Sequence, residues 1–123
     1  MKPGATGFKR IVDATGYTLK GFAAAWRNES AFRQESLLGL VLAPLAFWLG
    51  RSTLEVALLL TTLAFVLVTE LLNSAIEAVV DRASPEFNEL AGRAKDMGSA
   101  AVFVALATVV VVWLLIALDR FLR

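Results

Sequence analysis

The 123-residue sequence contains no cysteine and no histidine. Without cysteine the chain has no thiol nucleophile and no disulfide, and without histidine it has neither an imidazole base nor an ordinary zinc site. Charged residues are also few, at 19% of the chain, and they form no dense basic run of the kind that binds nucleic acid. Any chemistry must therefore use carboxylates, amides, hydroxyls and lysine.

Familiar targeting and nucleotide-binding motifs are missing as well. The first residues, MKPGATG, lead into mixed polar sequence and not into an apolar core with a small-residue cleavage site. We therefore expect the apolar segments to belong to the mature protein. The sequence matches neither a phosphate-binding glycine loop of the Walker type nor the catalytic loop of protein kinases.

Apolar residues dominate what is present. They make up 58% of the chain and give a mean hydropathy of +0.68, which is too apolar for a soluble domain of this size. Residues 98–118 form a run of 21 residues without a charge, and residues 56–68 are also apolar. Residues 37–49 form an apolar run of only 13 residues, which needs tilt or flanking residues to cross a bilayer. We predict an all-α membrane protein with one domain over residues 1–123 and spans at about residues 31–49, 55–82 and 97–118.

Two further segments are more polar. At about residues 8–27, apolar side chains recur at helical spacing among lysine, arginine and aspartate, a pattern typical of a helix that lies on a membrane surface. Residues 83–96, which carry Pro85, are predicted to form a polar connection between the second and third spans.

Lysine and arginine are distributed unevenly between the two sides that three spans would create. Residues 1–35 and 82–97 hold nine of them, and the other side holds three. Because positive residues accumulate on the cytoplasmic side, we expect the N-terminus and residues 82–97 there, with the C-terminus in the periplasm. The polar face of the second span needs neighbours, which predicts a homo-oligomer.

Four polar side chains share one face of the second predicted span. Glu70, Asn73, Glu77 and Asp81 stand at i, i+3, i+7 and i+11, which keeps them within about 80° of one another on a helix. An ionisable group inside a span costs at least about 2.5 to 3.5 kcal/mol, so such groups usually face a site or a partner. The stripe is a candidate active site; hydrogen bonding between subunits or early emergence into water is the alternative.

From composition and spacing alone, this stripe indicates either a small membrane enzyme or an ion-coupled protein with an acidic site on its cytoplasmic side. Phosphoryl transfer from a nucleotide is one chemistry that it suits. Mg²⁺ is usually held by one or two carboxylates together with nucleotide phosphates, a role that fits Glu77 with a second carboxylate such as Glu29. A carboxyl group held deeper can accept a proton from a lipid hydroxyl, which fits Glu70. Lys95 and Asp96 lie on the same predicted side, although charges that flank a span often serve only as anchors.

Two stretches resemble the signature of prokaryotic diacylglycerol kinases: ELLNSAIEAVVDR at residues 70–82 and GRAKDMGSAAV at residues 92–102. Shorter matches extend the resemblance to nearly the whole chain, at residues 7–8, 16–17, 24–26, 28–29 and 31–35. That family is a trimeric three-span enzyme with a surface helix. The resemblance implies a homotrimer in the bacterial inner membrane that uses ATP and Mg²⁺ to convert diacylglycerol to phosphatidic acid and that binds no nucleic acid.

The resemblance also implies roles for individual residues. Glu70 would accept the proton of the lipid hydroxyl, while Glu29 and Glu77 would hold the metal on ATP. The residues implied in nucleotide binding are Arg10, Tyr17, Glu29, Asn73, Glu77, Glu86, Phe87, Asn88, Lys95 and Asp96. The residues implied in lipid binding are Arg10, Ala14, Thr15, Gly16, Tyr17, Thr18, Leu19, Ala23, Ala24, Ala25, Trp26, Ala31, Phe32, Arg33, Gln34, Glu35, Trp48, Leu49, Gly50, Arg51, Glu70, Ser99 and Trp113.

The chain departs from the common family pattern at residues 85–88, where PEFN replaces a segment in which an aromatic hydroxyl is followed by histidine. A similar sister branch in Gram-positive bacteria phosphorylates undecaprenol and tends to lack the RAKDMGS motif found here at residues 93–99. The resemblance therefore favours diacylglycerol as the substrate. Three competing hypotheses are undecaprenol phosphorylation, a small oligomeric proton-coupled transporter that uses Glu70 as its carrier group, and a non-catalytic membrane scaffold.

Overall fold

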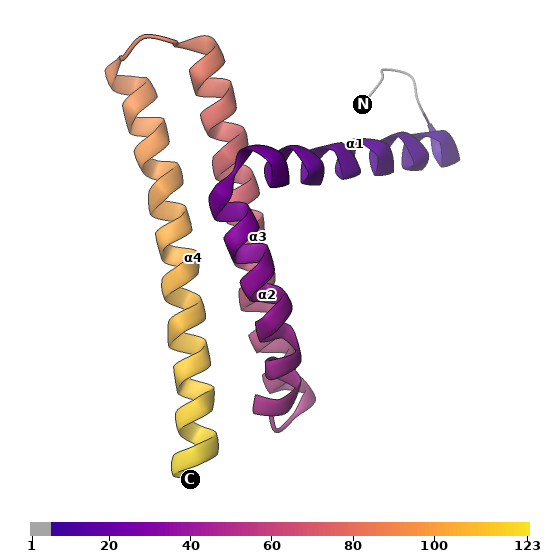
Figure 1. Cartoon of the computed structure of the whole chain (residues 1–123), viewed down its shortest axis with the longest axis vertical. Coiled ribbons are helices and arrows are strands. Elements are labelled where there is room, and N and C mark those ends of the chain that lie inside the picture. The colour runs from indigo at the N-terminus through magenta and orange to yellow at the C-terminus, as the bar shows by residue number, and fades with distance from the viewer. Residues whose placement is uncertain (1–5) are drawn as a thin grey trace.

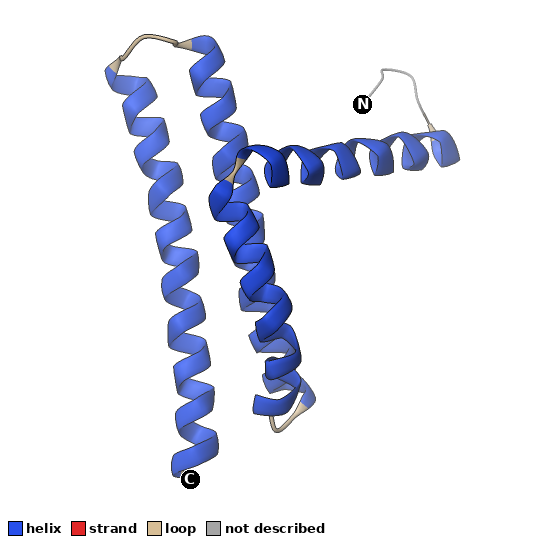
Figure 2. Cartoon of the chain, in the orientation of Figure 1, coloured by secondary structure: helices blue, strands red, loops and turns tan. Residues whose placement is uncertain are grey.

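The structure, a computed structural model, describes residues 6–123, which form four α-helices joined by short connections (Figures 1 and 2). Helix α1 (Gly7–Asn28) projects away from the other helices, whereas α2 (Ser30–Leu49), α3 (Thr53–Ala83) and α4 (Glu89–Leu122) run alongside one another (Figure 1). Helix α3 packs against both α2 and α4. The all-α fold class predicted from the sequence is thereby confirmed.

Single polar residues stand where α2, α3 and α4 begin. Glu29, in an extended conformation, is the single residue between α1 and α2, and the chain changes direction there. The Ser52 hydroxyl caps α3 by accepting a hydrogen bond from the Glu55 backbone N–H at 3.1 Å, and the Asn88 carboxamide oxygen caps α4 by accepting one from the Ala91 N–H at 2.8 Å. These caps satisfy backbone donors that the first turn of a helix leaves free.

The connection between α3 and α4 is shorter than the sequence predicted. Residues 83–96 were expected to form a polar connection, but the chain is non-helical only over residues 84–88. Helix α4 begins directly after Asn88 because that side chain supplies the N-cap, and because the residues that follow are mostly good helix formers without proline. Lys95 therefore stands on the first turns of a rigid helix and not in a loop.

Among the described residues, two helices, α3 and α4, are long and apolar enough to cross a membrane. Helix α2 is not one of them; Arg33, Gln34 and Glu35 stand in its first two turns and reduce its apolar length. The third predicted span therefore stays a prediction. Large apolar side chains such as Val68 and Phe103 are exposed along α3 and α4, as expected of surfaces that lipid or another protein chain covers.

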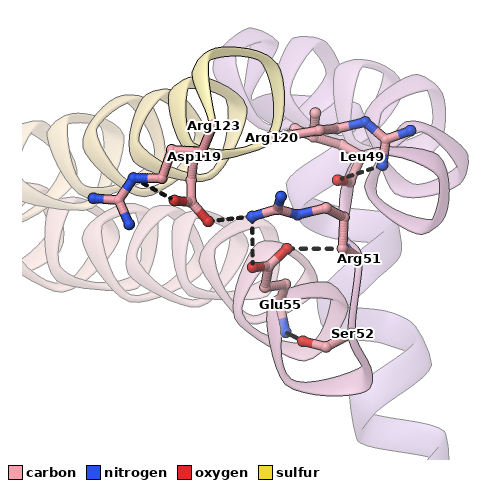
Figure 3. Close-up of polar contacts among 7 residues, drawn as sticks. All are labelled: Leu49, Arg51, Ser52, Glu55, Asp119, Arg120 and Arg123. Carbon is pink, nitrogen blue, oxygen red and sulfur yellow. Dashed lines mark hydrogen bonds and ion pairs between the residues drawn. The ribbon is translucent and has the colours of Figure 1, made fainter.

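A polar cluster joins the α2–α3 turn to the end of α4 (Figure 3). Arg51 forms an ion pair with Asp119 of α4 and, at 3.9 Å, with Glu55 of α3, while Arg120 donates a hydrogen bond to the Leu49 carbonyl at 3.3 Å. The cluster adjoins the buried apolar core, which consists of Ala46, Leu49, Leu59 and Ile116. The three long helices are thus held together at the end opposite the α3–α4 connection (Figure 1).

Candidate active site

Glu70 lies on the packing face of α3. The buried residues of this helix, Leu59, Thr62, Val66 and Glu70, recur every three or four positions and so share one face. Glu70 is 5% exposed and is the only buried charged residue in the described part of the chain. The carboxyl group is therefore directed into the helix bundle and away from its surface.

Three other carboxylates lie close enough to Glu70 to interact with it electrostatically. Glu29 comes from the α1–α2 junction and Glu77 from two turns further along α3. Glu35 comes from the second turn of α2. Like charges at short range repel, so this arrangement favours a bound cation or proton. Within residues 6–123 no three acidic side chains meet closely enough to enclose a metal ion unaided, so a cation would need ligands from another molecule as well.

Asn73 connects this carboxylate group to α4. Its carboxamide nitrogen Nδ2 donates a hydrogen bond to Oε1 of Glu77 at 3.3 Å. Its oxygen Oδ1 is buried, has no hydrogen-bond partner and lies against the backbone of α4 at Gly98. Two members of the predicted stripe, Asn73 and Glu77, are therefore hydrogen-bonded to each other, and the amide has a neighbour on both sides.

Further toward the α3–α4 connection, Lys95 forms an ion pair with Asp81 at 2.5 Å. The hydrogen bond to the Asp81 carboxylate raises the pKa of Lys95 above its usual value, which keeps the amine charged. Both residues line a hollow of about 230 Å³ whose wall also includes Glu86, Phe87 and Asn88. Four of the residues predicted to bind nucleotide thus surround one hollow.

A second hollow, of about 520 Å³, lies between the end of α1 and α3. Ala24, Ala25 and Glu29 line it from the α1 side, and Ser74 and Ala75 line it from α3. Two predicted lipid contacts, Ala24 and Ala25, and the predicted metal ligand Glu29 therefore line the same hollow. Because the lining is mostly small and apolar, the hollow suits an apolar or amphipathic molecule better than a highly charged one.

Several other predicted site residues lie far from the carboxylates of Glu29, Glu70 and Glu77 within one chain. Tyr17 and Arg10 are exposed on α1, about 18 Å and 28 Å along the helix axis from the α1–α2 junction. Trp113 donates a hydrogen bond to Thr62 at 3.0 Å, and Arg51 belongs to the cluster at the far end of the bundle. Predicted lipid contacts also at that far end are Trp48, Leu49 and Gly50.

The remaining predicted contacts follow the helices on which they stand. Those on α1 are Ala14, Thr15, Gly16, Thr18, Leu19, Ala23 and Trp26. Those on the first turns of α2 are Ala31, Phe32, Arg33 and Gln34, of which Phe32 is buried. Asp96 and Ser99 are exposed on α4.

For two residues near the carboxylates, the contacts that the structure shows were not predicted from the sequence. Glu35 was predicted only as a lipid contact, but it lies within electrostatic range of Glu70. Gly98 stood in the quoted motif without a role, but it contacts Asn73. For Glu35 the available signal was a carboxylate at the start of an apolar helix, on the same predicted side of the membrane as the stripe. For Gly98 no signal in the sequence distinguishes it from the other glycines.

Comparison with known proteins identifies a family for the chain. The family model for prokaryotic diacylglycerol kinase matches residues 16–117. A diacylglycerol kinase of Pseudomonas aeruginosa is 56% identical over 115 residues, which cover 94% of each chain. One of Escherichia coli strain K12 is 48% identical over 121 residues, 98% of this chain and 99% of that protein. One of Helicobacter pylori is 42% identical over 113 residues, 92% and 88% of the two chains. The chain therefore belongs to the prokaryotic diacylglycerol kinase family.

Proposed function

We propose that this protein transfers the γ-phosphoryl group of ATP to diacylglycerol and so forms phosphatidic acid in the bacterial inner membrane. One observation carries the proposal: a buried carboxyl group, Glu70, has Glu29 and Glu77 within electrostatic range, in a chain whose relatives are named diacylglycerol kinases. The buried group suits proton transfer, and the flanking pair suits a cation that arrives with phosphate.

In the proposed reaction the hydroxyl oxygen of diacylglycerol attacks the γ-phosphorus of ATP. The hydroxyl proton passes to the carboxylate of Glu70, the new bond forms between the lipid oxygen and phosphorus, and the bond from phosphorus to the β,γ-bridging oxygen breaks to release ADP. A positioned base typically contributes about 10²- to 10⁴-fold to the rate. The burial of Glu70 on the packing face of α3 supports this role, because it separates the carboxyl group from bulk water.

Glu29 and Glu77 are proposed to hold Mg²⁺ on the ATP phosphates. Mg²⁺ commonly takes one or two protein carboxylates and completes its coordination with phosphate and water, which agrees with the lack of a three-carboxylate group in residues 6–123. When bound, the ion neutralises negative charge on the phosphates. Asn73 orients Glu77 through its amide. The proposed nucleotide contacts beyond these are Arg10, Tyr17, Glu86, Phe87, Asn88, Lys95 and Asp96.

We also propose that the protein acts as a homotrimer. A single chain leaves large apolar side chains exposed on α3 and α4, including Val68, Phe103 and Val111, and contact between copies would cover part of this surface. The proposed lipid contacts lie along α1, the start of α2 and the bundle surface, where a membrane lipid can reach them.

Purified protein in mixed micelles with labelled ATP and Mg²⁺ tests the proposed function. Label should enter phosphatidic acid when diacylglycerol is supplied, at least about tenfold faster than it enters undecaprenyl phosphate when undecaprenol is supplied. Micelles without either lipid, and reactions with a chelator, serve as controls. Faster labelling of undecaprenol would overturn the substrate, and labelling of neither lipid would overturn kinase activity in favour of a transporter or scaffold.

Membrane orientation is a separate prediction, because ATP is available only in the cytoplasm. Ser52 and Asn88 lie at opposite ends of α3 (Figure 1), and the sequence has no cysteine of its own. In intact cells, Ser52→Cys should react with a membrane-impermeant thiol reagent and Asn88→Cys should stay protected until the cells are opened.

Because Ser52 and Asn88 both cap helices, Thr53→Cys and Glu86→Cys provide a matched pair that keeps the caps. Labelling of Asn88→Cys or Glu86→Cys from outside, with Ser52→Cys and Thr53→Cys protected, would show that the protein has the opposite orientation. The carboxylates would then have no access to ATP, and the kinase proposal would be wrong.

A further inference from the structure

At Gly98 the backbone of α4 lies close against the Asn73 side chain of α3. This residue is buried, and a Cβ atom at its position would lie 2.1 Å from Oδ1 of Asn73 and 3.2 Å from the Cγ of that side chain. Contacts of a Cβ below 3.0 Å are essentially never found in proteins. Only glycine therefore allows the Asn73 carboxamide to lie where it does.

Other glycines in the helices do not share this constraint. A Cβ at Gly16, Gly21 or Gly39 would meet nothing within 4 Å, and one at Gly92 would make an ordinary contact of 3.5 Å with the Phe87 ring. Close approach of a polar side chain to the backbone is thus specific to Gly98 among these positions.

The orientation of the Asn73 amide depends on both of its neighbours. Its Nδ2 must face Glu77, because a carboxylate accepts hydrogen bonds and repels a carbonyl oxygen. Its Oδ1 therefore faces α4, where it has no N–H or O–H donor. A hydrogen of the Gly98 Cα points at this oxygen, in the direction that a Cβ would take, and makes the kind of weak C–H···O contact found between closely packed helices.

We propose that Gly98 is a positioning residue for the reaction: the absence of a side chain lets α4 lie against the Asn73 carboxamide, which holds the amide in the orientation that binds Glu77. The inference deepens the proposed function and rests on it. Gly98 touches neither ATP nor lipid in this scheme, and it acts through Asn73 on the carboxylate that binds the metal.

The first test is Gly98→Ala. The added methyl group must displace the Asn73 amide, so Glu77 loses its orienting hydrogen bond. We expect kcat/KM for Mg-ATP to fall about 10- to 100-fold, with a higher half-saturating Mg²⁺ concentration and little change in the apparent KM for diacylglycerol. Gly39→Ala, the same change where there is open space, should stay within about twofold of the parent.

A double-mutant cycle with Asn73→Ala separates positioning from a general packing defect. The Asn73 Cβ lies 3.8 Å from the position of the new methyl group, an ordinary van der Waals distance, so truncation at Cβ removes the clash. In the Asn73→Ala background, Gly98→Ala should therefore have almost no further effect on kcat/KM. An equal loss in both backgrounds, or an active Gly98→Ala single variant, would overturn the proposal.

Thermal unfolding in detergent measures the same coupling without any reaction. Gly98→Ala should lower the melting temperature of the parent but raise that of the Asn73→Ala variant, where only the better helix propensity of alanine remains. If the single variant does not fold, recovery of folding in the double variant supports the proposal, and failure of both overturns it. Because this cycle needs no substrate, it is unaffected if the lipid assay rejects diacylglycerol.

Discussion

Replacing Glu70 with glutamine should lower the turnover of diacylglycerol by at least about 100-fold, the usual scale for loss of a positioned base. Glutamine has nearly the same shape and keeps a hydrogen-bonding end, but it cannot accept the hydroxyl proton. Initial rates in mixed micelles at saturating Mg-ATP and lipid measure this directly. We expect Glu70→Asp to be intermediate, because it keeps the carboxylate but withdraws it by about one carbon–carbon bond.

The fold and nucleotide binding should survive the change. Glu70 is 5% exposed, so an isosteric neutral side chain fills its place, and removing a buried ionisable group should leave the melting temperature unchanged or raise it. Glu89→Gln, which alters an exposed carboxylate at the start of α4, is the matched control and should stay within about twofold of the parent. Near-normal turnover of Glu70→Gln would mean that the proton goes elsewhere.

The second large effect is expected at the two proposed metal ligands. Glu77→Gln and Glu29→Gln should each raise the Mg²⁺ concentration needed for half-maximal rate and the apparent KM for Mg-ATP, and should slow the reaction by about 10- to 100-fold. Both changes remove a negative charge from the neighbourhood of Glu70. Glutamine at position 77 can still accept the hydrogen bond from Asn73 through its oxygen, so the variant tests the charge and not the positioning.

Magnesium titrations at fixed ATP, read as initial rates, distinguish this role from a general defect. Excess Mg²⁺ should restore part of the lost rate in Glu77→Gln and Glu29→Gln, whereas it should restore none in Glu70→Gln, which lacks the base. Glu89→Gln again serves as the control with an unchanged titration curve. If the curves of Glu29→Gln and Glu77→Gln overlay that of the parent, the metal is held by other groups.

Several features were predictable because they depend on residues close together in the chain. The uncharged run at residues 98–118 lies in α4, and the amphipathic pattern at about residues 8–27 corresponds to α1. Since α3 is helical throughout, the spacing of Glu70, Asn73 and Glu77 sets their common face directly. The polar connection expected at residues 83–96 is shorter in the structure, because the cap at Asn88 starts α4 within that segment. The polarity of the segment resembles that of a loop, so the start of the helix was not apparent.

The sequence by itself determined an apolar all-helical chain, an acidic stripe on one helix and a chemistry limited to carboxylates, amides, hydroxyls and lysine, because composition and helical register are local properties. Only the tertiary structure decided which side chains from different helices meet: Glu35 near Glu70, Lys95 on Asp81, and Gly98 against Asn73. Those contacts depend on how α2 and α4 pack against α3. The physical reason is that helix packing is set by the shapes of whole surfaces, and no short stretch of sequence records which residues of two helices will face each other.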